Sequence, residues 1–156
     1  MKNISGAYLK TYSSSIGRNI MHLCFKTKYC HKIFDDAQVR QRCAEILQET
    51  SERHDIAIRE MGFDRDHVHL TLGAGPNYSP SSVSKILKGN SGWKLLQEFP
   101  RLKKQYFWGS GLWSPSYYFD SIGERTCSEM DGYVRNQGTP RRKIAKGQAK
   151  LTDFAS

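Results

Sequence analysis

Two histidines separated by one residue, His67 and His69, are the side chains of this sequence best placed to do chemistry. They lie in a run, residues 66–72, in which polar and apolar residues alternate. Because alternate side chains of a β-strand point to opposite faces, both histidines are predicted to line one surface together with Thr71. The apolar residues of the run are predicted to fill the core: Val68, Leu70 and Leu72. Two neutral imidazoles on one face can share a metal ion.

A metal held by two imidazoles keeps open coordination positions, and one further side-chain oxygen would hold it more firmly. Gln137 can supply that oxygen from a predicted helix over residues 124–137. This ligand set suits Mg²⁺ or Mn²⁺ better than a structural zinc ion, which is closed by four protein ligands. Tyr133 lies one helical turn before Gln137, so its phenol is a candidate nucleophile beside the metal.

The composition indicates one basic domain. The chain has 156 residues, with 24 Lys and Arg against 15 Asp and Glu, and a formal net charge of +9. The excess of positive charge favours a polyanionic partner such as nucleic acid. No apolar run is long enough to span a bilayer, and residues 1–19 lack the apolar centre of a signal peptide. We therefore expect a soluble, cytoplasmic protein.

The cysteines give no sign of a zinc knuckle or a disulfide framework. They form no C-x-x-C pair and have no regular spacing. Most of them lie at apolar positions of predicted elements, where a free thiol acts as a small hydrophobe. We expect all of them to be reduced: Cys24, Cys30, Cys43 and Cys127.

The first half of the chain has a strand-helix-strand-strand pattern. Residues 20–25 alternate with period two, as in a strand, and a helix capped by Asp35 or Asp36 follows. A second strand begins at residues 56–58. Residues 62–65 are predicted to form a turn into the histidine strand, so that these two strands make a hairpin.

The second half begins with a predicted loop over residues 73–80. A long helix is then predicted to start at Ser81 or Ser82, because either hydroxyl can cap it. Its apolar residues recur every three or four positions. Gly89 and Gly92 are expected to interrupt it, since glycine weakens a helix interior.

Pro100 is predicted to limit this helix, and residues 112–119 to form a fourth strand whose Pro115 favours an edge position. The fold class is therefore α+β, with a ferredoxin-like or RRM-like β-α-β-β-α-β antiparallel sheet. Both helices should cover one face and leave the other open. A C-terminal helix over residues 124–137 carries the tyrosine, and residues 138–156 form a basic tail.

Short motifs along the chain point to one family. They are Asp66-His67-Val68-His69, Lys85-Ile86-Leu87-Lys88-Gly89, Glu98-Phe99-Pro100-Arg101-Leu102-Lys103, Trp113-Ser114-Pro115-Ser116-Tyr117-Tyr118 and Tyr133-Val134-Arg135-Asn136-Gln137. Together they resemble the HUH-type single-tyrosine transposases of small bacterial and archaeal insertion sequences. The resemblance covers about residues 8–137. Its most specific part is the combination of His-hydrophobe-His with Tyr-x-x-x-Gln near the end of so short a chain.

This resemblance implies a metal-dependent enzyme that cuts and rejoins single-stranded DNA at hairpin-marked element ends. His67 and His69 would be metal ligands, Gln137 would complete the site, and Tyr133 would be the nucleophile. Attack by Tyr133 would give a 5′-phosphotyrosine and a free 3′-OH, so rejoining would need no nucleotide cofactor.

Similarity to this family also implies a homodimer in which the tyrosine helix docks on the partner subunit. Residues 121–123 would be the hinge, and the active site could form within one chain or between two. We expect a single transposase domain over residues 1–156. It would comprise a core over about residues 8–120, the tyrosine helix over about 124–137 and the basic tail over 138–156.

Basic residues interleaved with aromatic ones are predicted to form a groove for single-stranded DNA, because rings stack on bases while cations follow phosphates. The members of this series are Lys85, Lys88, Lys94, Arg101, Lys103, Lys104, Trp93, Tyr106 and Trp108.

Some remaining chemical side chains receive structural roles. Tyr117 and Tyr118 are rival nucleophiles, but they lie on a predicted strand with no neighbouring glutamine ligand, which favours packing or base stacking. His22 is predicted to be a hydrogen-bonded structural residue. His31 and His54 are predicted to lie at the surface.

Other functions fit the sequence less well. An RRM-like module that binds RNA needs exposed aromatic residues on its central strands, where this chain has His67 and His69. A two-histidine phosphodiesterase needs a second His-x-Ser/Thr motif, which His22, His31 and His54 do not provide. A domesticated relative that processes palindromic chromosomal repeats would have much the same sequence.

Overall fold

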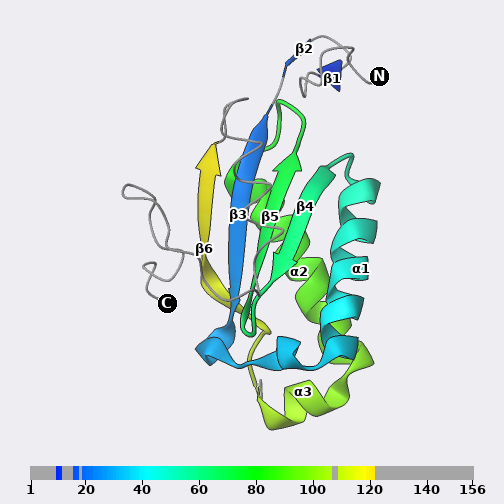
Figure 1. Cartoon of the computed structure of the whole chain (residues 1–156), viewed down its shortest axis with the longest axis vertical. Helices are drawn as coiled ribbons and strands as arrows, with labels where there is room; N and C mark the ends of the chain where they lie inside the picture. The colour runs from blue at the N-terminus through cyan, green and yellow to red at the C-terminus, as the bar shows by residue number, and fades with distance from the viewer. Residues whose placement is uncertain (1–9, 12–15, 18, 107–108, 122–156) are drawn as a thin grey trace.

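The computed structural model describes residues 10–11, 16–17, 19–106 and 109–121. Its main sheet is antiparallel, with strand order β4-β5-β3-β6 (Figure 1). The strands are β3 (Ile20–Thr27), β4 (Ala57–Phe63), β5 (His67–Gly73) and β6 (Trp113–Ser121). A separate two-stranded sheet, which the sequence did not predict, pairs β1 (Lys10–Thr11) with β2 (Ile16–Gly17).

Two long helices, α1 (Ala37–Arg53) and α2 (Pro80–Glu98), pack side by side against one face of this sheet (Figure 1). Short helices stand before and after them: η1 (Lys28–Cys30), η2 (Ile33–Asp35) and α3 (Pro100–Gln105). The order β3-α1-β4-β5-α2-β6 confirms the predicted ferredoxin-like arrangement. The predicted helix over residues 124–137 and the tail over 138–156 lie outside the described residues.

The hydrophobic core lies between the sheet and the helix pair, and its side chains are almost wholly removed from water. The strands contribute Met21, Leu23, Phe25, Val68, Leu70 and Leu72, and the helices contribute Val39, Cys43, Ile46, Leu47, Val83, Leu87 and Leu95. The apolar residues of β5 therefore point to the helices, as the alternation predicted. The polar residues of β5 point to the opposite face.

Helix α1 begins where the sequence predicts. The carboxylate of Asp36 accepts hydrogen bonds from the backbone N–H of Gln38 at 2.9 Å and of Val39 at 3.4 Å, so it caps the helix. His54 follows the last turn, and its ring nitrogen Nδ1 lies 2.9 Å from the carbonyl of Thr50. His54 is thus half-buried and tied to the helix end rather than free at the surface.

Helix α2 begins one residue earlier than predicted. Its cap is Ser79, and Ser79 and Ser82 form a reciprocal capping box around Pro80. Proline is well tolerated at a first helical position, because its missing N–H would have no partner there. The expectation that Ser81 or Ser82 caps the helix is therefore wrong.

The glycines of α2 do not interrupt it, contrary to prediction. The helix is continuous through Gly89 and Gly92. At Gly92 a Cβ atom would lie 3.2 Å from Cδ1 of Trp113, so the missing side chain lets the indole pack against the helix. The indole N–H of Trp113 donates to Oγ of Ser91 at 2.9 Å. Close packing of the helix on β6 thus offsets the weak helix propensity of Gly92.

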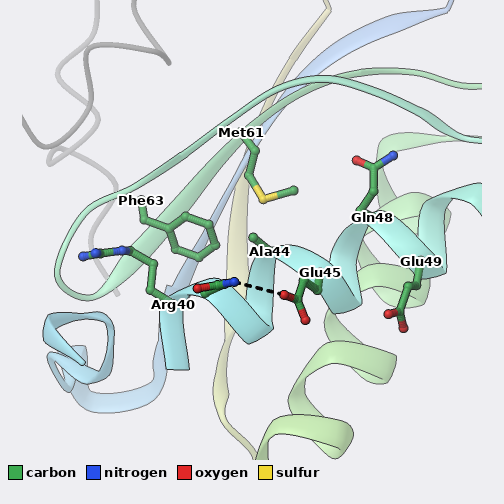
Figure 2. Close-up of a pocket in the computed structure, with 8 residues that line it drawn as sticks. Arg40, Ala44, Glu45, Gln48, Glu49, Met61 and Phe63 are labelled. Atoms are coloured by element: carbon green, nitrogen blue, oxygen red, sulfur yellow. Dashed lines mark hydrogen bonds between the residues drawn. The ribbon is translucent and has the colours of Figure 1, made fainter. Parts of the chain in front are cut away.

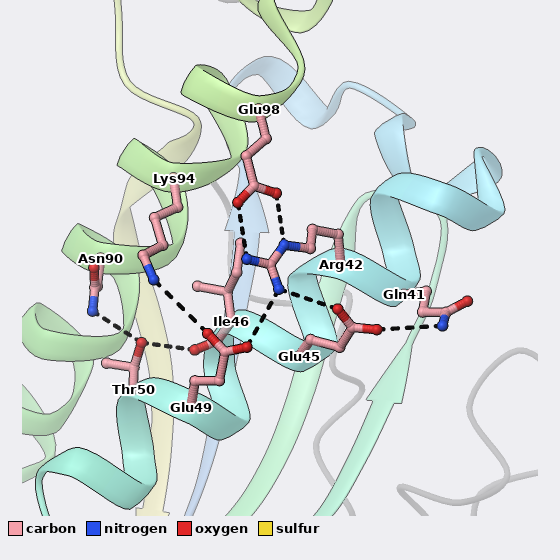
Figure 3. Close-up of polar contacts among 9 residues, drawn as sticks. All are labelled: Gln41, Arg42, Glu45, Ile46, Glu49, Thr50, Asn90, Lys94 and Glu98. Carbon is pink, nitrogen blue, oxygen red and sulfur yellow. Dashed lines mark hydrogen bonds and ion pairs between the residues drawn. The ribbon is translucent and has the colours of Figure 1, made fainter.

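The outer surfaces of α1 and α2 are joined by polar contacts, drawn in Figure 3. The guanidinium of Arg42 donates to both carboxylate oxygens of Glu98, at 2.6 and 2.9 Å, and to Glu45 at 3.1 Å. Farther along, Nδ2 of Asn90 donates to Oγ1 of Thr50 at 3.0 Å. These contacts pair polar groups between the helices, from the exposed Glu98 to the buried Thr50.

Strands β4 and β5 form the predicted hairpin, but its turn is shorter than predicted. Gly62 and Phe63 belong to β4, where Gly62 pairs with His69. The backbone N–H of Asp64 donates to the carbonyl of His67 at 2.9 Å, which closes the turn. Phe63 packs against the core, so its burial favours continuing the strand past Gly62.

Strand β6 is an edge strand, as Pro115 predicted, and it runs from Trp113 to Ser121. The basic segment before it forms α3, which the sequence did not predict.

Within the described residues no helix is long and apolar enough to cross a membrane.

Candidate active site

The rings of His67 and His69 meet on the face of β5 that is turned away from the helices. Their centroids are 4.6 Å apart and their planes make an angle of 80°. The predicted pairing of the two imidazoles is therefore present. The predicted openness of this face is wrong at its centre, because His69 and Thr71 have no exposed surface and only His67 is half-buried.

The side chain of Asp66 orients His67. Its Oδ1 lies 2.7 Å from Nδ1 of His67, so the imidazole donates its N–H there and carries its lone pair on Nε2. The carboxylate of Asp64 lies on the other side, with Oδ2 3.7 Å from Nε2. A ring fixed in this way presents Nε2 as a ligand, and sequence reasoning gave Asp66 no role of its own.

His69 is kept neutral by its surroundings. Burial lowers its pKa well below 6.5, and the neighbouring rings of His67 and His22 lower it further. A neutral imidazole has the lone pair that a metal ion needs, whereas a protonated one does not. The environment of His69 therefore suits metal binding at neutral pH.

His22 belongs to the same cluster, contrary to the prediction of a hydrogen-bonded structural histidine. Its ring lies parallel to that of His69, with centroids 5.7 Å apart and planes at 6°. Burial lowers the pKa of His22 to about 4. Neither ring nitrogen has a hydrogen-bond partner in the part of the chain that the structure describes. The period-two pattern of β3 placed His22 on this face, but only the register with β5 shows that it reaches His69.

Tyr118 lies at the far edge of the cluster. Its ring meets that of His22 at 6.0 Å in an edge-to-face contact, whereas Tyr117 packs against the core. Burial raises the pKa of Tyr118, and the nearby carboxylate of Asp120 raises it further. A phenol with a raised pKa is a weak nucleophile, so packing beside His22 is the role that its environment favours.

Two imidazoles, of which His67 is oriented by the carboxylate of Asp66, fit a divalent metal ion as part of its ligand set. Within the described ranges, no three His, Cys, Asp or Glu side chains come close enough to hold a metal by themselves. The further oxygen ligand would have to come from elsewhere, and Gln137 lies outside those ranges, as does Tyr133. Both assignments remain predictions.

The cysteine predictions are confirmed where they can be checked. Cys24, Cys30 and Cys43 are free thiols, and Cys127 lies outside the described residues. Burial raises the pKa of Cys24 to about 12, so this thiol stays protonated although it pairs with His69 across β3 and β5. It is therefore poorly suited to act as a ligand.

Two cations of the predicted basic and aromatic groove, Lys88 and Lys94, contact other protein groups. Nζ of Lys88 donates to the carbonyl of Ser114 at 2.6 Å and lies within 3.4 Å of that of Ser116, so it ties α2 to β6. Lys94 lies 3.8 Å from the carboxylate of Glu49. These cations are already engaged by protein groups. The other described members of the series lie on α2 and on or next to α3, and Trp108 lies outside the described residues.

The linings of two surface depressions include neither His67 nor His69. One of about 640 Å³ lies between α1 and β4 (Figure 2). It is lined by Arg40, Gln41, Ala44, Glu45, Gln48, Glu49, Met61 and Phe63. Met61 and Phe63 also pack against the core, so this depression opens beside the helical face and lies apart from His67 and His69.

Comparison with known proteins decides the class of the molecule. A family model described as "Transposase IS200 like" matches residues 15–137. The chain belongs to the IS200-like transposase family. As an IS200-like transposase, it is a DNA strand transferase.

Relatives of known sequence agree with this family. The ISDra2 transposase TnpA of Deinococcus radiodurans is 31% identical over 116 residues, which cover 74% of this chain and 81% of the relative. The transposase for insertion sequence element IS200 of Salmonella typhimurium is 32% identical over 116 residues, or 74% of each chain. IS200-like transposases thus match most of this chain and most of their own length.

Solved structures of transposases share the fold. A crystal structure of a candidate transposase from Deinococcus radiodurans has a TM-score of 0.66 and 32% identity, covering 82% of this chain and 97% of that one. A REP-associated tyrosine transposase bound to a REP hairpin has a TM-score of 0.56 and 12% identity, covering 81% and 71%. The second likeness concerns the fold alone.

Proposed function

We propose that this IS200-like transposase is a metal-dependent enzyme that cleaves and rejoins single-stranded DNA at hairpin-marked ends. The observation that carries the proposal is the pair of imidazoles on β5. One is oriented by Asp66, and the other is kept neutral by burial. Together they form half of a divalent metal site that faces away from the hydrophobic core.

In the proposed reaction Tyr133 is the nucleophile. Its phenolic oxygen forms a bond to the phosphorus of a DNA phosphodiester and loses its proton. The bond from phosphorus to the 3′-oxygen breaks, and that oxygen takes up a proton to become a free 3′-OH. The 5′-phosphotyrosine conserves the energy of the broken phosphodiester bond. A second 3′-OH can therefore displace Tyr133 and rejoin the strand without a nucleotide cofactor.

We assign His67, His69 and Gln137 as the residues that hold the metal, with Mg²⁺ or Mn²⁺ as the ion. The ion supplies stabilisation of negative charge on the reacting phosphate. Asp66 acts through His67, because it fixes the tautomer and the plane of that ring. Tyr133 must reach this face from outside the hairpin that carries the histidines.

The proposed partners are DNA hairpins and a second copy of the chain. The net charge of +9 suits a polyanion, and a structure of the same fold is described as bound to a REP hairpin. In the homodimer the tyrosine helix, residues 124–137, would dock on either subunit. The whole of residues 1–156 would then act as one transposase domain.

The decisive experiment is a search for the covalent intermediate. Labelled single strands from both flanks of the chain's own gene are incubated with protein, and adducts are separated in denaturing gels. We expect adducts with Mg²⁺ or Mn²⁺ and none with EDTA. Tyr133→Phe should abolish the adduct, whereas the matched control Tyr118→Phe should retain it. Loss in Tyr118→Phe with retention in Tyr133→Phe would make Tyr118 the nucleophile.

A graded series tests the metal ligands in the same assay. His67→Ala should remove metal-dependent cleavage. Asp66→Asn should lower it by about 10- to 100-fold, the range found for groups that orient a metal-bound histidine. Glu52→Gln, on the outer side of α1, is the control and should be unchanged. Normal cleavage by His67→Ala would overturn the ligand assignment while leaving Tyr133 to be judged separately.

A further inference from the structure

One end of the sheet carries an aromatic and basic surface that the histidine site does not include. It is formed by the loop after β3 and by α3, which lie together at the lower end of the molecule in Figure 1. We define this surface as the α3 corner: Lys28, Tyr29, Cys30, His31, Lys32, Arg101, Leu102 and Tyr106. Three of its members are aromatic or imidazole rings.

Tyr29 is held outward by an uncommon backbone. Tyr29 and Cys30 have φ angles of 61° and 55°, the left-handed region that residues other than glycine rarely adopt. The loop is fastened on both sides, because the N–H of Lys28 donates to Leu112 O at 2.8 Å and Oγ1 of Thr27 donates to His31 O at 2.8 Å. The result is a phenol ring that is 70% exposed on a fixed base.

A hollow of about 520 Å³ lies next to the loop that carries this ring, and Cys30 and His31 are part of its lining. Part of its wall is the ring pair of His31 and Tyr106, whose centroids are 4.8 Å apart. Tyr29 meets His31 edge to face at 5.9 Å. The rings of Tyr29, His31 and Tyr106 thus form one row. Nζ of Lys28 lies over the ring of Tyr29, 5.9 Å from its centroid, and the side chain of Tyr29 is still mostly exposed.

The charges around the hollow favour an anion. Its two carboxylates are already paired, Asp36 with Arg101 and Asp35 with Arg65. Arg101 and Arg65 lower the pKa values of Asp36 and Asp35, which therefore stay ionised in these pairs. Four lysines of the loop and of α3 form no ion pair with any described residue: Lys28, Lys32, Lys103 and Lys104.

The α3 corner lies next to the histidine site along the sheet. Lys26, the last position of β3 that pairs with β5, lies opposite His67. The N–H of Thr27 donates to Asp66 O at 2.8 Å, and the N–H of Phe34 donates to Arg65 O at 3.1 Å. A chain leaving His67 toward this end of the sheet would therefore meet the α3 corner first.

We propose that the α3 corner binds an unpaired nucleotide of the single strand that leads to His67 and His69. The base stacks on the exposed face of Tyr29, and its phosphates lie against Lys28 and Lys32. Every base can stack on an aromatic ring, so this subsite increases the affinity for the strand and helps to position it without distinguishing between base sequences. The inference rests on the proposed action on single-stranded DNA and adds a place where that strand is held.

The test compares two DNA ligands: a hairpin with a single-stranded extension and the same hairpin without it. Tyr29→Asn removes the ring while tolerating a left-handed backbone. It should weaken binding to the extended hairpin by about fivefold or more, because one stacked base contributes about 1–3 kcal/mol. Binding to the hairpin without extension should be unchanged. Tyr29→Phe keeps the ring and should bind both as the wild type does.

Phe119 supplies a matched control, since its ring on β6 is 53% exposed and lies outside the α3 corner. Phe119→Ala should leave both affinities unchanged. Equal binding of the extended hairpin by Tyr29→Asn and wild type would overturn the subsite, and so would equal losses on both DNAs. Failure of wild-type protein to bind either DNA would instead count against the proposed function.

A fluorescent base gives a second readout that does not depend on affinity. With 2-aminopurine placed at successive positions of the extension, saturating wild-type protein should quench one position through stacking. Tyr29→Asn should restore that emission, and Tyr29→Phe should not. Quenching that is identical in Tyr29→Asn and wild type would also overturn the assignment of Tyr29.

Discussion

On the helical side of the molecule, Arg42 joins α1 to α2 through Glu98, and every charged group of that contact meets an opposite charge near solvent. On the other side of the sheet, His22 and His69 lie ring against ring in a buried position. Both regions are polar. In the second region both ring nitrogens of His22 are removed from water without a hydrogen-bond partner among the described residues, whereas on the helices this holds for the single hydroxyl of Ser84.

This difference indicates what each region is for. Burying a polar group without a hydrogen bond is costly, so a fold selected for stability alone would place apolar side chains there. Proteins keep such groups where chemistry needs them. The contact of Arg42 with Glu98 is explained by stability alone, whereas the buried side chains of His22 and Thr71 lower stability, which is the pattern expected of a functional site.

Neighbouring residues of β5 give the sharpest test of that contrast, because Leu70 and Thr71 are both fully buried but point to opposite faces. Leu70→Ala should cost about 2–5 kcal/mol of unfolding free energy through the cavity it leaves. Thr71→Val removes a buried hydroxyl without a partner among the described residues and should be neutral or stabilising by about 1 kcal/mol. Urea unfolding measures both. A large loss in Thr71→Val would remove the contrast.

Acid should act on the two regions in different pH ranges. Since the pKa of His22 is about 4 when folded and 6.5 otherwise, the unfolded chain binds the extra proton between these values. Stability is therefore full above pH 6.5 and falls toward pH 4 by on the order of 3 kcal/mol. Arg42 holds the pKa of Glu98 below 4.5, so the contribution of that pair is lost only in stronger acid.

Urea unfolding of the metal-free protein in EDTA, from about pH 7 down to about pH 4, measures this dependence. His22→Phe keeps a ring in the same place and should reduce the slope, leaving the part that comes from the lowered pKa of His69. An unchanged slope in that variant would assign the acid sensitivity to other groups.

The two glycines of α2 distinguish the side of the helix that faces the sheet from the side that faces solvent. Gly89→Ala meets nothing within 4 Å and should stabilise the protein by about 0.5–1 kcal/mol. Gly92→Ala should destabilise it by about 1–3 kcal/mol, because its Cβ would push on Trp113. Thermal unfolding of the two variants checks the opposite signs. If both Gly89→Ala and Gly92→Ala stabilised the protein, the indole of Trp113 would be able to shift away from the added Cβ at little cost.

Arg42→Met should have the smallest effect. The pair with Glu98 is close to solvent, where an ion pair contributes less than about 1 kcal/mol. The expected loss should shrink further in high salt, because exposed charges are screened. Chemical unfolding at low and high salt measures both. A loss as large as that of Leu70→Ala would mean that the helical side depends on its charges.

The sequence predicted the main sheet, the two long helices and which side chains of β5 point to the core, because apolar periodicity indicates which side of an element is buried. It failed where a contact between distant segments decides the outcome. Gly92 was expected to break α2, and only the indole of Trp113 explains why the helix continues. Lys88 was assigned to DNA, but its ammonium is used by the carbonyls of β6.

Within the candidate site, the sequence identified His67 and His69 from their spacing alone. It did not identify the orienting carboxylate of Asp66 or the membership of His22, because both depend on distances that spacing does not give. It also predicted an exposed pair, whereas His69 is fully buried. The assignments of Tyr133 and Gln137 stay predictions.

The short turn between β4 and β5 has a consequence for the order of folding. Both histidines, Asp66 and the backbone contact that closes the turn belong to one hairpin, in which contacting residues are close in sequence. Hairpins of this kind form in about 1–10 μs, well before strands distant in sequence find each other. The two imidazoles should therefore meet early, while His22 joins them only when β3 pairs with β5. Metal added during refolding should find His67 and His69 together before the rest of the sheet is complete.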